Sequence, residues 1–129
     1  MVPDEVVARL MEGVECMEVK RKRSIFRRGE PGPGLFLVKS GEFKLSLIPS
    51  ESREQILYLA EQGKMIGEGF LPQEVQCAAS AFAMQDSEVW RFDTADVIRL
   101  SAKSEALAFA LMRHMAVRSN RLIDLVLDL

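Results

Sequence analysis

A glycine-rich stretch, Gly63-Lys-Met-Ile-Gly-Glu-Gly-Phe-Leu-Pro72, holds one carboxylate, Glu68, between Gly67 and Gly69. Glycines at this spacing allow the backbone to turn sharply and to approach a ligand closely. A carboxylate held there accepts hydrogen bonds from the hydroxyls of a sugar or from an amide. The alternative is an ordinary turn with one exposed acid, so the surrounding elements must decide between the two.

Short strand patterns lie on both sides of this stretch. Residues 35–39 are compactly apolar and residues 42–47 alternate polar and apolar side chains, so the break at Ser40-Gly41 predicts a hairpin between them. Residues 76–84 are rich in alanine and have helical propensity, but the regular strands around them favour a strand. Further strand patterns lie at residues 54–59 and 87–92.

The N-terminal segment Asp4–Glu12 predicts a short helix with Val7, Leu10 and Met11 on one face. Acidic residues occupy its first turn and Gly13 follows its end, as is common at helix termini.

An extended segment then begins at Val14 and Cys16 and ends in the basic run Lys20-Arg-Lys-Arg23. We expect this run to form a solvated turn or strand end, with contact to an acidic partner as the alternative. Residues 24–34 predict a short strand and then a rigid turn, because three glycines and two prolines fall within residues 29–34.

The C-terminal part is helical in pattern. Asp93 or Thr94 caps a short helix, and Ser101 or Ser104 caps a second helix of about 25 residues. Apolar residues recur along the second helix in steps of four and three, with one charge among them, as in a heptad seam. The predicted dimer interface consists of Leu111, Met115, Arg118, Leu122, Leu125 and Leu129.

A second apolar stripe of this helix includes Leu107, Phe109 and Met112 and faces elsewhere. One stripe can cover the β-domain, and the other needs a partner, so we predict a homodimer, with packing inside one chain as the alternative. Together the elements predict an α+β, mainly β fold of about eight short strands in a jelly roll or β-barrel. The expected division is a sensor domain at residues 1–100 and a dimerisation helix at residues 101–129.

The composition is that of a single domain with a sizeable core, since 48% of the 129 residues are hydrophobic. The net charge of −2 does not indicate binding to nucleic acid or membranes. No signal peptide or membrane-spanning run is present, so we expect a cytoplasmic protein. Cys16 and Cys77 are too few for a structural zinc site, and we expect two buried thiols, with a redox pair as the alternative.

The order of these signals resembles the sensor domain of the Crp/Fnr family of bacterial transcription regulators. The resemblance rests on Ile25-Phe-Arg-Arg-Gly-Glu-Pro31, Leu35-Phe-Leu-Val-Lys-Ser-Gly-Glu-Phe-Lys-Leu45, Arg53-Glu-Gln-Ile-Leu57 and Gly63-Lys-Met-Ile-Gly-Glu68. It implies a double-stranded β-helix jelly roll, with a short N-terminal helix and a long C-terminal dimerisation helix.

In nucleotide-binding members of that family, a Gly-Glu pair opens a phosphate-binding cassette whose glutamate holds the ribose, a role that falls here on Glu68. An arginine about nine residues later binds the cyclic phosphate. Cys77 stands at that position, followed by Ala78. A thiol cannot replace the bidentate, charged hydrogen bonds of a guanidinium. The candidate pocket residues are therefore Gly67, Glu68, Gly69, Cys77 and Ala78, with an effector other than cyclic AMP.

The resemblance also implies a C-terminal helix-turn-helix domain, which the present chain lacks, and contacts with DNA and RNA polymerase through it. The alternative is a stand-alone sensor or interaction module. The effector is unknown. Haem is one option, with His114 or Cys77 as ligand, and a small organic acid that meets Arg118 is another. With one histidine and no paired-acid or nucleophile pattern, we expect no enzyme.

Overall fold

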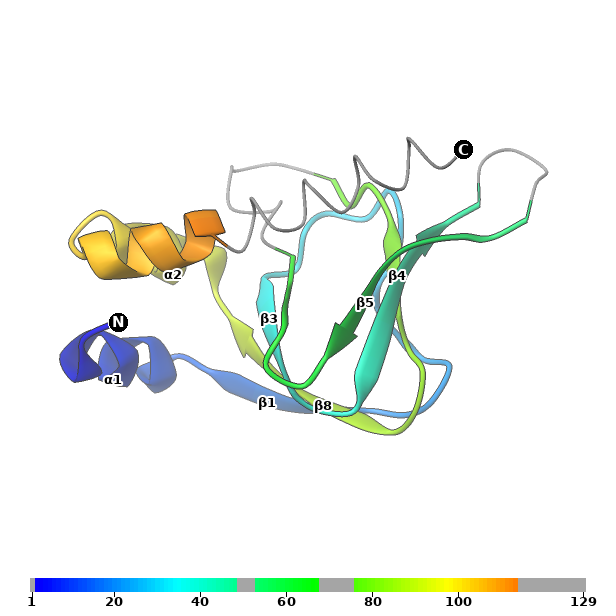
Figure 1. Cartoon of the computed structure of the whole chain (residues 1–129), viewed down its shortest axis with the longest axis horizontal. Helices are drawn as coiled ribbons and strands as arrows, with labels where there is room; N and C mark the ends of the chain where they lie inside the picture. The colour runs from blue at the N-terminus through cyan, green and yellow to red at the C-terminus, as the bar shows by residue number, and fades with distance from the viewer. Residues whose placement is uncertain (1, 49–52, 68–75, 114–129) are drawn as a thin grey trace.

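A computed structural model of the chain describes residues 2–48, 53–67 and 76–113 (Figure 1). The strands are β1 (Glu15–Val19), β2 (Ser24–Phe26), β3 (Leu35–Ser40), β4 (Glu42–Leu47), β5 (Gln55–Glu61), β6 (Met65–Ile66), β7 (Ser80–Ala83) and β8 (Ser87–Phe92). The helices are α1 (Asp4–Glu12) and α2 (Thr94–Ser101), and residues 105–113 are also helical. No helix among these residues is both long and apolar enough to cross a membrane.

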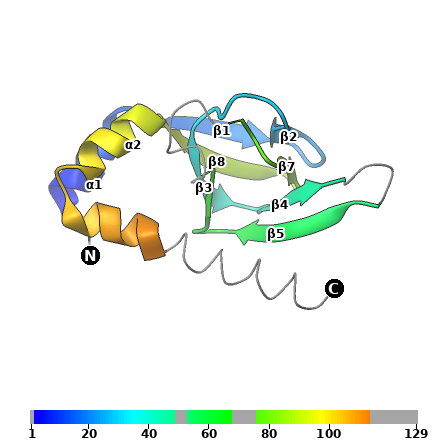
Figure 2. The same cartoon turned by 90° about the horizontal axis from the view of Figure 1, so that it is seen from above.

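The strands form two four-stranded antiparallel sheets. The first has the order β1-β8-β3-β6 and the second the order β2-β7-β4-β5. The chain passes repeatedly between the sheets, which together form the jelly roll that the sequence predicts. Figures 1 and 2 show both helices α1 and α2 together at one end of this β-roll.

The space between the sheets is filled by apolar side chains. Phe36, Phe43 and Ile66 are fully buried there, and the rings of Phe26 and Phe36 have their centroids 6.2 Å apart. Alternation of inward and outward residues along each strand produces this core, because successive side chains of a strand point to opposite faces.

A second apolar cluster joins the helices to the first sheet. Leu35 of β3 packs with Val97 and Leu100 of α2, and with Leu107 and Leu111 of the helical residues 105–113. Val6 and Leu10 of α1 pack against this cluster. The predicted apolar face of α1 is therefore partly wrong, since Val7 and Met11 are exposed. Val6 and Leu10 are four positions apart, so they lie one above the other on the helix and form the face of α1 that contacts this cluster.

The predicted hairpin between residues 35–39 and 42–47 is also wrong. β3 pairs with β6 and β8, whereas β4 pairs with β5 and β7 in the other sheet. Gly41, with φ of +90°, lies where the chain crosses from one sheet to the other. The backbone N–H of Glu42 donates to Oγ of Ser87 at 3.2 Å, so the crossing is tied to the start of β8. A glycine turn can therefore separate two strands as well as pair them.

The strand predicted at residues 76–84 is confirmed over its second half as β7. Its odd-numbered residues, Cys77, Ala79, Ala81 and Ala83, are buried, and the small alanines leave space for the phenylalanines of the core. In β1 the cysteine is not on the buried face: Met17 packs on the core, whereas Cys16 is exposed. The expectation of two buried thiols is thus wrong for Cys16 and confirmed for Cys77.

Candidate ligand-binding site

The glycine-rich segment leaves the first sheet at the end of β6. Ile66 is fully buried, and Gly67 follows it in the left-handed region with φ of +93°. This conformation is easily reached only by glycine, so Gly67 turns the chain away from the sheet at a buried position. Glu68 and Gly69 lie outside the described residues, so the predicted ribose carboxylate is not placed.

The described chain resumes at Gln76, next to the turn that follows β2. Gln76 forms a β-bridge with Pro31, and the Cys77 N–H donates to the carbonyl of Glu30 at 2.8 Å. In return the Gly29 N–H donates to the carbonyl of Cys77 at 2.8 Å. These backbone bonds bring the predicted motif at residues 25–31 next to the end of the candidate cassette.

Cys77 points into the interior of the β-roll, whereas Ala78 is exposed. The Cys77 side chain is 3% exposed and belongs to the core between the sheets, and its Sγ lies 3.9 Å from the carbonyl oxygen of Pro31. Burial raises the pKa of the Cys77 thiol, and the negative charge of Glu30 raises it further. Cys77 therefore presents a small, neutral group to the interior of the β-roll. Its place at the phosphate-binding arginine of the family stays a prediction from the sequence.

The raised pKa of Cys77 also bears on the haem prediction. A cysteine binds iron as the thiolate, so surroundings that keep the thiol protonated oppose this role. Cys77 as a candidate haem ligand stays a prediction. His114, the other candidate, lies outside the described residues.

Two other candidate arginines for a phosphate, Arg91 and Arg53, lie outside the buried core. The Arg91 Nε donates to the carbonyl of Pro33 at 2.7 Å and its Nη1 lies 3.8 Å from Glu15, so this side chain braces the turn before β3. Arg53 is exposed. In the part of the chain that the structure describes, the buried polar or charged residues are Ser46, Ser87 and Ser104, and none of them is a cation. The described interior therefore offers no positive charge to a phosphate.

The helical residues 105–113 correct the predicted dimer interface at Leu111. Ser104 caps this helix, because its Oγ accepts from the Leu107 N–H at 3.3 Å. This start turns Leu107 and Leu111 toward α2 and β3, and Leu111 is only 6% exposed. Phe109 and Met112 are instead 60% and 59% exposed. The other predicted interface residues, Met115, Arg118, Leu122, Leu125 and Leu129, lie outside the described residues.

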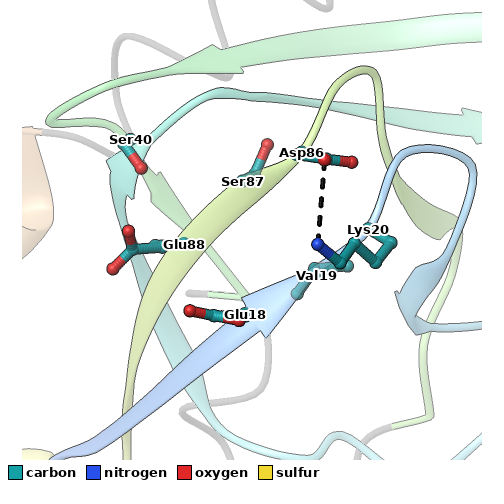
Figure 3. Close-up of a pocket in the computed structure, with 7 residues that line it drawn as sticks. All are labelled: Glu18, Val19, Lys20, Ser40, Asp86, Ser87 and Glu88. Atoms are coloured by element: carbon teal, nitrogen blue, oxygen red, sulfur yellow. Dashed lines mark ion pairs between the residues drawn. The ribbon is translucent and has the colours of Figure 1, made fainter.

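The basic run is a solvated turn, as predicted, and it borders a pocket of about 160 Å³ (Figure 3). Nζ of Lys20 lies 3.8 Å from Oδ2 of Asp86, and the Arg21 N–H donates to Oδ1 of the same carboxylate. Glu88, on the other side of this pocket, pairs with Lys39 at 3.4 Å. The contacts of Asp86 join the turn between β1 and β2 to the turn before β8, and the pair of Lys39 and Glu88 joins β3 to β8. Two of the three acids of this pocket, Asp86 and Glu88, thus take part in ion pairs.

The carboxylate of Glu54, directly before β5 of the second sheet, has a shifted pKa. Glu54 accepts from Nζ of Lys44 at 2.8 Å and from Oγ of Ser46 at 2.9 Å. These two hydrogen bonds, that of Lys44 first, lower the pKa of the Glu54 carboxyl below its ordinary value of 4.5. Ser46 is buried because the register between β4 and β5 shifts at Leu45 and Ser46, which turns two consecutive residues inward.

Replacing Glu54 by glutamine is therefore expected to destabilise the fold more at neutral pH than in acid. The lowered folded-state pKa contributes stability above the unfolded pKa, and this contribution is lost as the pH falls below about 4.5. Urea unfolding of both proteins between about pH 3 and about pH 7 measures the difference. Glu61→Gln, at the exposed far end of β5, is the control. A loss of stability from Glu54→Gln that stays constant across this pH range would contradict the lowered pKa of Glu54.

Residues 16–104 match the model of a protein family described as cyclic nucleotide-binding domain. The cyclic AMP receptor protein of Thermus thermophilus is 34% identical over 107 residues, which cover 83% of this chain and 49% of that protein. The solved catabolite activator protein of Thermus thermophilus has a TM-score of 0.79 at 28% identity, and the match covers 98% of this chain and 59% of that one.

A third similarity supports the fold alone. The sensor domain of the transcriptional regulator DNR from Pseudomonas aeruginosa has a TM-score of 0.78 at 23% identity, and the match covers 93% of this chain and 81% of that chain. The chain spans about half the length or less of the first two curated relatives that it matches, 28% of one and 49% of the other.

Proposed function

The chain belongs to the cyclic nucleotide-binding domain family, and from this premise we propose that it senses an effector other than cyclic AMP for a Crp/Fnr-type transcription regulator. The resemblance to Crp/Fnr regulators that the sequence predicts is confirmed. The proposal adds three features that belong to a whole regulator: dimerisation, DNA binding through a helix-turn-helix domain, and contact with RNA polymerase in the cytoplasm. The proposed role is binding and signalling, and it includes no catalytic step.

One observation carries the exclusion of cyclic AMP. Cys77, which takes the place of the phosphate arginine in the family pattern, is a buried thiol beside the carboxylate of Glu30. A cyclic phosphate brought to this position would meet a neutral group and a nearby negative charge. Two charge-assisted hydrogen bonds from an arginine contribute about 1.5–3 kcal/mol each, so their loss weakens binding by a factor of about 100 or more.

Isothermal titration calorimetry with cyclic AMP and with cyclic GMP is expected to show no saturable heat below about 1 mM ligand. The cyclic AMP receptor protein of Thermus thermophilus, measured under the same conditions, is the positive control. Glu68→Ala is the matched variant, because a nucleotide bound through the cassette would depend on this carboxylate. Micromolar binding that Glu68→Ala abolishes would overturn the proposal.

In the proposed mechanism, the helix that Ser104 caps transmits a change in the β-roll to the rest of the regulator. An effector that fits one arrangement of the β-roll and this helix better than another shifts the population toward that arrangement. Leu107 and Leu111 fasten the helix to β3 and α2, so a change at the β-roll is transmitted to the helix through this apolar contact. The helix would then reorient DNA-binding domains attached beyond it. The alternative, a stand-alone sensor, uses the same contact without DNA.

Phe109→Glu combined with Met112→Glu is expected to convert a dimer into a monomer. Both side chains are largely exposed on the outer face of the helix, where a second copy would cover them, and charge there opposes burial. Sedimentation velocity at several concentrations measures the change, and circular dichroism checks that the fold persists. Ile98→Glu, on the exposed face of α2, is the control. A wild-type chain that stays monomeric, or a double variant that still dimerises, would contradict this interface.

A further inference from the structure

An apolar cavity of about 150 Å³ lies between the first sheet and the helices. Its walls come from six parts of the fold: Leu10 of α1, Leu37 of β3, Met65 of β6, Phe92 of β8, Val97 of α2, and Leu107 and Leu111 of the helical residues 105–113. The cavity lies in the second apolar cluster and meets the core between the two sheets at Phe36, and Cys77 is not among its lining residues.

The lining determines what can occupy this space. Every residue around the cavity is apolar, and the cavity surface exposes no polar atom. A water molecule needs two to four polar partners and finds none here, so water gains nothing by entering. An enclosed apolar cavity of about 150 Å³ stays dry and binds benzene. The present cavity has a similar volume and is partly open to solvent.

We propose that this cavity binds a neutral, apolar molecule of about six to ten non-hydrogen atoms, such as a one-ring aromatic compound. The site does not depend on cyclic-nucleotide chemistry or on Glu68. It would remain if the calorimetric test showed that the cassette binds cyclic AMP, so failure of either proposal is distinguishable from failure of the other.

Occupancy of this site acts on the position of the helix. Leu107 and Leu111 form one wall, and Leu37 and Met65 form another, so the ligand contacts both sides of the joint between helix and β-roll. The cavity exists only while the helix is packed against the first sheet. A ligand that binds only this arrangement stabilises it in proportion to its concentration over its Kd.

Methyl NMR spectra of the 129-residue chain, titrated with toluene, test the proposal. We expect saturable shifts at the methyl groups of Leu10, Leu37 and Leu107, with a Kd on the order of 1 mM or tighter. The methyl groups of Ile56 and Leu59, exposed on the second sheet, are expected to stay unchanged. Phenol, of the same size, is expected to bind about tenfold more weakly, because its hydroxyl group would be buried without a partner.

Two variants of α1 complete the test. Leu10→Trp places a larger side chain in the cavity and is expected to weaken toluene binding at least about tenfold. Val7→Trp, on the exposed face of the same helix, is expected to leave the affinity within about twofold. Linear, unsaturable shifts in the wild-type protein, equal affinity for toluene and phenol, or unchanged binding in a folded Leu10→Trp variant would each overturn the proposal. Should Leu10→Trp not fold, the comparison of toluene with phenol decides.

Discussion

Replacing Gly41 by alanine is expected to lower the free energy of unfolding by about 3–5 kcal/mol, a large part of the total stability of one domain. Gly41 has φ of +90°, a conformation that alanine adopts only with strain. An added Cβ would also collide with Ser87, at 2.6 Å from its Cβ and 2.8 Å from its Cα, and closer still to its Oγ.

Rotation of the Ser87 side chain cannot relieve this collision. The hydroxyl donates to the carbonyl of Gln85 at 2.8 Å and accepts from the Glu42 N–H, and the Cα belongs to the backbone of β8. The crossing between the sheets would therefore have to move away from β8. Such a displacement would separate β3 and β4 from the partners that hold them.

Gly63→Ala separates the steric cost from the conformational one. Gly63 has a similar φ of +84°, but an added Cβ would meet no atom within 4 Å. We expect a loss of only about 1–2 kcal/mol for this control. Urea unfolding at equilibrium measures both values. Equal losses for the two variants would show that contact with Ser87 is not what makes Gly41 necessary.

Phe43→Ala is expected to cost about 3–5 kcal/mol. The side chain is fully buried between the sheets, and its register partners are Ala60 on β5 and Ala83 on β7. Because these neighbours are already alanines, they cannot extend into the space that the ring leaves. The cavity therefore persists, and a persistent cavity places the cost at the upper end of the range.

Ile48→Ala is the matched control for Phe43→Ala. Ile48 directly follows β4 and is 56% exposed, so its truncation is expected to change stability by less than about 1 kcal/mol. Chemical unfolding monitored at Trp90 compares the two variants with the wild type. A loss below about 2 kcal/mol for Phe43→Ala would mean that the β-roll collapses around the missing ring, contrary to the packing described here.

Local patterns predicted most of the elements correctly. Period-two alternation identified the strands around residues 42–47 and 87–92, and a further strand was predicted at residues 54–59. The acidic first turn with Gly13 identified α1 within its observed bounds. Asp93 was one of two predicted caps, and its carboxylate accepts from the Ala95 N–H at 2.8 Å. Such features depend on residues close in sequence, so they can be read without the fold.

The candidate site was predictable only in part. Alternation along residues 77–83 implies that Cys77, Ala79, Ala81 and Ala83 share one face, and burial of that face could have been inferred from their small apolar side chains. The neighbouring charge that further raises the pKa of Cys77 could not have been inferred, since Glu30 lies 47 positions earlier in the sequence. The bonds between Cys77, Glu30 and Gly29 form only when the cassette end meets the turn after β2.

The division between sequence and tertiary structure is clearest at Gly41 and Leu111. The sequence by itself determined that a turn occurs at Gly41 and that the last helix has two apolar faces. Only the tertiary structure decided that the turn separates two sheets and that Leu107 and Leu111 face inward. The reason is physical: period and turn propensity are local properties of the chain. The choice of strand partner and of buried helix face depends on apolar surfaces that meet only in the folded protein.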